Sequence, residues 1–380
     1  MSFYTKYLRN TLFLYFLFLL TSCEEPFTPE VLERPNNFLV VSGFINSNGP
    51  TAIKLSRTQN LSEEGGPAME TRATVTVAEE NGPTYLLRET AAGTYTSGRL
   101  PIQNSKRYRL VIKAGGKDYA SDYVEVKQTP VIDKISWQAE SDGLQFMVTT
   151  HDDQNNTRFY RWEYEETWEY RAYYYSEYEY VNGEMQYRRP ENDIYLCWQN
   201  NSSKNILINN TVKLSQDVVS NYPLLKLPAN SDKLANKYSL LVKQYAQSKE
   251  SYEYWDALKK NTENIGTLFD PLPTQLTGNI TCLTDPAEPV IGFINISSVE
   301  EKRIFVNKSE LPTGWRPPSM HCTIDTVAVK DLKEHFSSGF NIPVSMIYSD
   351  MGAFLGYSGA SSTCADCRVY GTKTKPDFWQ

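Results

Sequence analysis

Short apolar runs closed by turn-forming residues are the feature that most constrains how this 380-residue chain can fold. Within residues 37–130 apolar and polar residues alternate, as around Val75 and Val77, and turn residues such as Asn81-Gly82 and Gly115-Gly116 separate the runs. Alternate residues lie on one face of a strand, and glycine adopts the positive φ of a tight turn at little cost. Residues 37–130 are therefore predicted to form an Ig-like β-sandwich.

The remaining residues, 131–380, are predicted to form a larger β-rich domain with one or two helices, which makes the protein mainly β. A second domain is expected because a single core rarely grows beyond about 250–300 residues. One helix is predicted near residues 249–265. Ser248 can cap its first turn and Gly266 follows its last. Trp255 lies on its apolar face and is expected to pack onto a sheet.

The most unusual segment of the second domain is rich in tyrosine and tryptophan. Its aromatic residues at even positions from 160 to 170 share one strand face, where they could stack against a ligand or fill a core. We expect Trp162 and Trp168 to fill the core. The tyrosines that follow stand beside Glu177 and Glu179 and are expected to be exposed, because a tight core seldom accepts so many hydroxyls. They are the candidate ligand-binding or interface residues: Tyr173, Tyr174, Tyr175, Tyr178 and Tyr180. The tract is predicted to belong to a long hairpin that turns at Asn182-Gly183.

The N-terminal residues indicate an exported, lipid-anchored protein. Lys6 and Arg9 precede an apolar stretch that ends in Leu20-Thr21-Ser22-Cys23, as in a bacterial lipoprotein signal peptide. The stretch is about ten residues long, which covers only about half of a ~30 Å hydrocarbon core. Residues 1–22 are therefore predicted to be removed, and Cys23 to carry the acyl chains, palmitate among them, that bind the membrane. Residues 23–36 are predicted to be an acidic tether.

The charge of the chain argues against a nucleic-acid partner. The whole sequence carries a net charge of −7. Removal of the signal peptide takes away Lys6 and Arg9 and no acid, so the mature protein is more acidic still. A nucleic-acid-binding surface needs a basic patch to neutralise phosphates, and none is evident here.

With Cys23 lipidated, five cysteines remain for the folded protein, and structural disulfides are expected because an exported protein folds in an oxidising compartment. Since five is an odd number, at least one thiol must stay free or pair outside the chain. Cys364 with Cys367, and Cys197 with Cys282, are the candidate pairs. A zinc site formed by Cys322, Cys364, Cys367 and His321 is an alternative, and buried or free thiols are another.

No residues stand in a recognisable catalytic motif, and no catalytic residue, metal or cofactor is predicted. The three histidines, His151, His321 and His335, lie far apart in the sequence. Glu165 and Glu166 are adjacent, so they point to opposite faces of a strand and cannot act together as a glycosidase pair. The protein is therefore not expected to be an enzyme.

Several short blocks follow one another along the chain: Tyr160-Arg161-Trp162, Glu166-Thr167-Trp168, Cys197-Trp198, Tyr252 to Trp255, Gly266 to Pro273, Gly278-Asn279-Ile280, Val290 to Phe293, Lys302 to Phe305, Cys364-x-x-Cys367-Arg368 and Lys375-Pro376-x-Phe378-Trp379. In this order they resemble the DUF4249 family. The resemblance implies an outer-membrane lipoprotein of the Bacteroidota, of a kind often encoded beside TonB-dependent receptors, and it supplies no catalytic residues. Glu24 and Glu25 also resemble the surface-export signal of Bacteroidota lipoproteins.

Three function classes remain open from the sequence. The favoured hypothesis is a non-enzymatic lipoprotein on the outer face of the outer membrane, which serves as a binding or accessory subunit of a TonB-dependent receptor and captures a small ligand or nutrient. The second is a structural or adhesive protein of the cell envelope, since sandwich folds often serve recognition alone. The third and least favoured is an envelope hydrolase.

Overall fold

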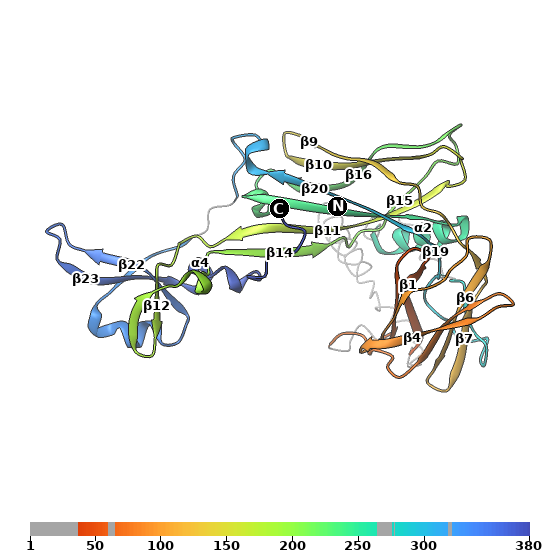
Figure 1. Ribbon diagram of the computed structural model, residues 1–380, viewed down its shortest axis with the longest axis horizontal. Helices are drawn as coiled ribbons and strands as arrows, with labels where there is room; N and C mark the ends of the chain where they lie inside the picture. Colours follow the sequence, from red (N-terminus) through yellow and green to blue (C-terminus); the bar gives the residue numbers. More distant parts are fainter. Residues whose placement is uncertain (1–36, 60–64, 264–275, 277, 318–320) are drawn as a thin grey trace, which may run out of the picture. The chain divides into compact units, whose positions relative to one another are not determined.

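The computed structural model describes residues 37–59, 65–263, 276, 278–317 and 321–380, and its fold is mainly β (Figure 1). All elements named below lie within these residues. The predicted signal peptide, Cys23 and the whole of the tether lie outside them. None of the helices in this part of the chain is long and apolar enough to cross a membrane.

A ten-stranded sheet contains the strands of the predicted N-terminal sandwich, in the order β18-β7-β6-β3-β4-β5-β2-β1-β19 with β8 paired to β6. Buried residues from strands at both ends of this order, such as Leu39 and Ile280, share one core, so the sheet wraps around it. The alternation of buried and exposed residues in the strands follows the period of two. The strands are β1 (Leu39–Asn46), β2 (Pro50–Arg57), β3 (Thr74–Glu79), β4 (Thr84–Ala91), β5 (Thr94–Arg99), β6 (Arg107–Ala114), β7 (Lys117–Ser121), β8 (Val124–Glu125), β18 (Ile280–Cys282) and β19 (Ile296–Ser297).

The last two of these strands come from far along the chain, in a region that the sequence prediction assigned to the second domain. β19 pairs in parallel with β1, where Ile296 lies opposite Ile45, and β18 pairs with β7. Asn279 joins the two segments, because its side chain accepts from the backbone N–H of Ile294 (2.8 Å) and donates to its carbonyl oxygen (2.9 Å). The N-terminal unit is therefore completed by residues 280–297.

A second sandwich is formed by two sheets that share one apolar core. One sheet has the order β16-β10-β9, and the other has β14-β11-β17-β20 with β15 paired to β11. Trp162 and Trp168 of β11 are buried in this core, which confirms that they have a structural role. The strands are β9 (Ile132–Ala139), β10 (Gly143–Asp152), β11 (Phe159–Arg171), β14 (Leu196–Ser202), β15 (Leu207–Asn210), β16 (Asp217–Pro228), β17 (Lys237–Ala246) and β20 (Val299–Asn307).

Glu166 lies on the buried face of β11 among these aromatic residues and is only 1% exposed. A buried carboxylate must be paired to be tolerated, and Glu166 accepts hydrogen bonds from Lys233 Nζ (2.8 Å), the Tyr238 hydroxyl (2.8 Å) and Asn201 Nδ2 (3.0 Å). Glu165 instead forms an ion pair with Lys243. The two glutamates thus have separate surroundings, as their adjacent positions predict.

The predicted helix is present as α2 (Lys249–Glu263), and Ser248 caps it by accepting a hydrogen bond from the backbone N–H of Ser251 (3.1 Å). Its predicted last residues and Gly266 lie outside the described residues. Ser251 and Tyr254 form its buried face. Trp255 is only half-buried, and its ring lies 4.6 Å from the guanidinium of Arg161 on β11.

The remaining elements form a smaller module in which the hairpin β12–β13 packs beside the sheet β21-β23-β22 (Figure 1). The predicted turn at Asn182-Gly183 joins the hairpin, with both residues at positive φ. The strands are β12 (Tyr178–Val181), β13 (Glu184–Tyr187), β21 (Asp325–Val327), β22 (Asn341–Tyr348) and β23 (Phe354–Ser361); the helices are α3 (Leu332–Phe336) and α4 (Ser362–Ala365). Five 3-10 turns complete the described elements: η1 (Pro190–Asn192), η2 (Asp232–Leu234), η3 (Lys308–Glu310), η4 (Val329–Asp331) and η5 (Cys367–Val369).

Two disulfides are present in and beside this module, and both predicted pairings are wrong. Cys197 of β14 is bonded to Cys367 of η5, and Cys322 is bonded to Cys364 of α4. Cys282 is buried in the apolar core of the ten-stranded sheet and is the free cysteine among the described ones. The zinc alternative is also wrong, because a metal needs thiolates and these sulfurs are oxidised. The physical reason for the error is that sequence spacing carries no information on which strand ends meet.

Candidate functional site: a cleft lined by tyrosines

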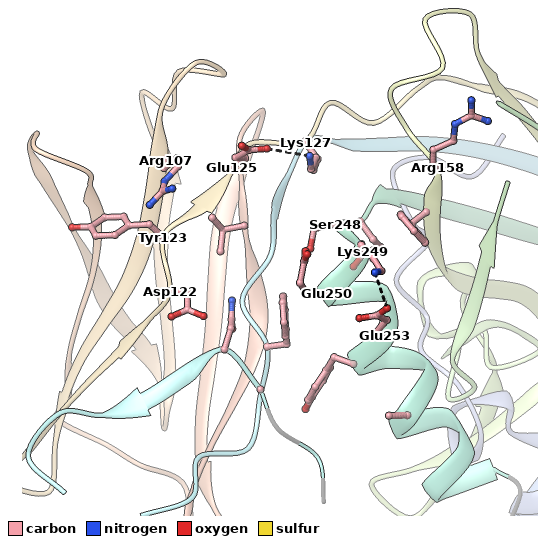
Figure 2. Close-up of a pocket in the computed structure, with 18 of the residues that line it drawn as sticks. Arg107, Asp122, Tyr123, Glu125, Lys127, Arg158, Ser248, Lys249, Glu250 and Glu253 are labelled. Carbon is pink, nitrogen blue, oxygen red and sulfur yellow. Dashed lines mark hydrogen bonds and ion pairs between the residues drawn. The ribbon is translucent and has the colours of Figure 1, made fainter. Parts of the chain in front are cut away.

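Two clefts of about 950 Å³ each stand out in the described part of the chain. The first, which we call the polar cleft, has one wall from the ten-stranded sheet and another from the first turns of α2 (Figure 2). Its charges are mixed and partly paired: Lys127 lies 3.3 Å from Glu125, and Lys249 lies 3.6 Å from Glu253. A charged ligand would have to compete with these ion pairs, so the polar cleft is the weaker candidate.

The second cleft, which we call the tyrosine cleft, has three partly exposed tyrosine rings in its wall. Its other residues include amides, one hydroxyl and an equal number of guanidinium and carboxylate groups. Small-molecule sites have this composition, in which apolar walls carry a few polar groups. The lining residues are Glu169, Tyr170, Arg171, Ala172, Tyr173, Gln199, Pro228, Asn230, Ser231, Asp232, Ala235, Asn236, Arg316, Pro317 and Tyr370.

The end of β11 supplies Tyr170, and the chain then leaves the sheet so that Tyr173 is exposed. The backbone N–H of Ala172 donates to the carbonyl oxygen of Tyr195 (2.9 Å), which fixes this exit. Tyr370 comes from the turn after η5, and the Cys197–Cys367 disulfide holds that turn against β14. The rings of Tyr170 and Tyr370 meet edge to face at 5.2 Å. A disulfide between distant segments therefore positions Tyr370 in this wall.

The ionisable groups of the tyrosine cleft are suited to binding rather than proton transfer. Burial, reinforced by Tyr370 and Asp232, raises the pKa of Tyr170 to about 12, so its hydroxyl stays protonated at neutral pH. Glu169 accepts a hydrogen bond from the indole N–H of Trp379 (3.1 Å) and lies 3.7 Å from Arg171. A general acid or base works best with a pKa near the working pH, which the Tyr170 hydroxyl does not offer, and the Glu169 carboxylate is already engaged by Trp379 and Arg171.

Other groups that could carry out chemistry lie elsewhere. His151 is bonded to Asp133 (2.7 Å), and this hydrogen bond raises its pKa. Within the residues that the structure describes, no group of three or more His, Cys, Asp or Glu side chains could hold a metal ion. Glu166 is held in a core, as described above.

The five tyrosines singled out from the sequence have different surroundings. Tyr173 lines the tyrosine cleft, and Tyr175 is exposed beside the ring of Tyr195. Tyr174 and Tyr180 are half-buried, and the Tyr174 hydroxyl donates to the carbonyl oxygen of Cys322. Tyr178 is buried, contrary to expectation, because the rings of Tyr187 and Tyr357 cover it at 4.5 and 5.1 Å. The tract therefore contributes one residue to the cleft.

Tyr370 and Asp232 also line the tyrosine cleft, and neither was predicted from the sequence. Tyr370 is brought there by the pairing of Cys197 with Cys367, a contact between segments 170 residues apart. Asp232 stands in the first turn of η2, on a connection between β16 and β17. Cys367 and Arg368 belong to one of the blocks named in the sequence. Only the knowledge that Cys367 pairs with Cys197 could have placed Tyr370 near Tyr170.

A second aromatic surface lies on the smaller module, and we call it the aromatic row. It consists of five rings in successive contact at 4.5–5.7 Å: Tyr187, Tyr178, Tyr357, Phe354 and Tyr348. The two inner tyrosines are buried, whereas Tyr187 at one end is 69% exposed and Tyr348 at the other is 55% exposed. Met351, between β22 and β23, is also exposed.

Comparison with known proteins gives a family and little else. No curated protein matches the chain. A crystal structure of a DUF3823 family protein from Parabacteroides merdae ATCC 43184 is 8% identical, covering 56% of this chain and 92% of that one, and its TM-score of 0.13 is too low to carry any argument. The model of the family described as "Domain of unknown function (DUF4249)" matches residues 24–303, well over half of the sequence. The chain therefore belongs to the DUF4249 family.

Proposed function

We propose that this protein is a non-enzymatic lipoprotein of the outer membrane, anchored through Cys23 and facing the cell exterior. It acts as an accessory subunit of a TonB-dependent receptor and helps to capture an imported ligand. The observation that carries the proposal is the aromatic row, an exposed aromatic surface on a module held by two disulfides.

The aromatic row has the chemistry of a protein interface. Tyrosine, phenylalanine and methionine are enriched where proteins bind one another, and the exposed ends of the row, with Met351 near them, offer these side chains together. The buried rings of Tyr178 and Tyr357 support the exposed ones from beneath. Disulfides limit the motion of the module, so little conformational entropy is lost when it binds.

Anchoring at the membrane follows from the sequence of the N-terminal residues. A tether over residues 23–36 spans at most about 45 Å at ~3.3 Å per residue. A protein on so short a tether works close to the membrane and to any β-barrel embedded in it. Disulfides, which persist in oxidising compartments, support a location outside the cytoplasm.

Co-purification from outer membranes tests the proposal. Tagged full-length protein, extracted in mild detergent, should retain a TonB-dependent β-barrel receptor in stoichiometric amount. The triple variant Tyr187→Ala, Tyr348→Ala, Phe354→Ala should lose it. Leu86→Ala, which removes an exposed apolar side chain from β4, is the matched control and should retain it. Recovery of the wild-type protein without any β-barrel partner would contradict the proposal.

The exposed aromatic row also favours a second candidate, a structural or adhesive envelope protein, because the same rings could bind a surface instead of a receptor. A deletion strain separates the two. Reduced uptake of a nutrient with normal attachment supports the accessory role. Normal uptake with altered surface attachment supports the adhesive one.

A further inference from the structure

We propose that the tyrosine cleft binds a neutral oligosaccharide. This inference rests on the proposed function, since it names the class of ligand that the lipoprotein captures. It is drawn from three properties of the cleft: the arrangement of its aromatic rings, the type of its uncharged polar groups, and the balance of its charges.

The aromatic rings offer apolar faces that remain open to solvent. Tyr173 is 54% exposed and Tyr370 is 45% exposed. The rings of Tyr170 and Tyr370 are inclined by 60°, so the wall presents ring faces in two directions. A tyrosine combines a large apolar face with a polar tip. A sugar ring has the matching form, with a C–H face that can lie on the aromatic ring and hydroxyls around its edge.

The uncharged polar groups match those hydroxyls. Gln199, Asn230 and Asn236 each bring an amide, which both donates and accepts hydrogen bonds, and Ser231 brings a hydroxyl. Sugar hydroxyls also donate and accept. A planar hydrocarbon or indole would use the rings but leave these polar groups without partners, which costs free energy once water is excluded.

The charges of the cleft exclude a strongly charged ligand. Arg171 and Arg316 are balanced by Glu169 and Asp232, and Arg171 lies 3.7 Å from Glu169. An anionic ligand such as a uronic acid or a phosphate would meet the two carboxylates, and a cationic one would meet the two guanidinium groups. A neutral ligand meets no unbalanced charge.

The size of the cleft favours more than one sugar unit. Its volume of about 950 Å³ lies at the upper end of the range for small-molecule sites, about 300–1,000 Å³. Two of the rings, Tyr170 and Tyr173, come from the end of β11 and the residues after it, and Tyr370 comes from the turn after η5, so the three rings can contact successive units of a chain. We therefore infer an oligosaccharide rather than a monosaccharide.

The test begins with the full mature protein on an array of neutral and acidic glycans, followed by calorimetry with the neutral glycan that binds best. Saturable binding of a neutral glycan is expected, and Tyr173→Ala and Tyr370→Ala should each weaken it by about tenfold or more. Tyr173→Phe keeps the ring and should retain most of the affinity. Phe340→Ala is the matched control, because Phe340 is 77% exposed but belongs neither to the tyrosine cleft nor to the aromatic row, and it should change nothing.

The inference is overturned if no glycan binds, if only acidic glycans bind, or if Tyr173→Ala and Tyr370→Ala leave the affinity unchanged while circular dichroism shows native folds. Saturable binding of free tryptophan that these variants abolish would assign the cleft to planar aromatic ligands instead. Co-purification with a receptor is scored separately. If a β-barrel is retained but no glycan binds, the proposed ligand class is wrong and the accessory role stands. If a glycan binds but no β-barrel is retained, the accessory role is wrong and the ligand class stands.

Discussion

The ten-stranded sheet and the second sandwich differ in what their cores enclose. The apolar core of the ten-stranded sheet consists of aliphatic side chains, tyrosines and the Cys282 thiol, and the buried carboxylate of this unit, Glu79, is still 9% exposed. The core of the second sandwich also encloses two carboxylates, Glu166 and Asp217, which are almost inaccessible to water. Each is satisfied by named partners: Glu166 by Lys233 and Tyr238, and Asp217 by the hydroxyls of Tyr160 (2.8 Å) and Thr211 (2.5 Å).

This difference shows which kind of interaction fixes the packing arrangement of each unit. Apolar contacts stabilise without selecting one partner, whereas a buried carboxylate is tolerated only where all of its hydrogen-bond donors are in place. In the second sandwich Glu166 ties β11 to η2 and to β17, so the aromatic side chains around it can pack in only one register. The stability of that unit should therefore depend on single polar contacts far more than the stability of the first.

The largest effect is expected from Lys233→Met, which keeps the length of the side chain and removes its charge. Glu166 would then be a buried carboxylate without its cation, and loss of one partner of a buried pair costs about 3–5 kcal/mol. Urea unfolding of the purified protein measures the change. Adding Glu166→Gln should recover a large part of the loss, because it removes the uncompensated charge.

The matched control comes from the ten-stranded sheet. Lys113 of β6 lies 3.5 Å from Asp118 of β7, both side chains are exposed, and a pair of this kind contributes at most about 1 kcal/mol. Lys113→Met should therefore be nearly neutral. Equal losses from Lys113→Met and Lys233→Met would show that the two units do not differ in the way described.

A smaller effect is expected from the double variant Cys197→Ala, Cys367→Ala. The disulfide joins segments 170 residues apart, and removal of a native disulfide typically costs about 2–5 kcal/mol. Because η5 positions Tyr370, glycan binding should weaken as well. Thermal unfolding and calorimetry measure the two effects. The ten-stranded sheet has no disulfide among its described residues, so protection of its amides in hydrogen exchange should change little.

The same disulfide marks where prediction from the sequence ends. Local patterns were sufficient to predict the turn at Asn182-Gly183, the helix cap at Ser248 and the burial of Trp162 and Trp168 on one face of their strand. Each of these depends on residues that are close in the chain. The joining of β18 and β19 to the first sheet and the position of Tyr370 depend on contacts across more than a hundred residues. No local pattern encodes which distant edge a strand will meet.

The smallest effect concerns acid pH, where a carboxylate of the second sandwich and one of the ten-stranded sheet should change stability in opposite directions. Burial raises the pKa of Asp217 above its ordinary value of 3.8, although two hydroxyls donate to it. Its contribution to stability is present below pH 3.8 and is lost as the pH rises through its raised pKa. Glu89 accepts from the backbone N–H groups of Arg72 (2.8 Å) and Gly93 (3.0 Å), which lower its pKa below 4.5.

The contribution of Glu89 is therefore present above pH 4.5 and is lost as the pH falls through its lowered pKa. Unfolding between pH 3 and 6 of the wild type, Asp217→Asn and Glu89→Gln measures both contributions as differences from the wild type. With rising pH the wild type should lose stability relative to Asp217→Asn and gain it relative to Glu89→Gln. Slopes of the same sign would mean that Asp217 is not held in a buried site distinct from the exposed site of Glu89 on β4, and the contrast between the two units would fail.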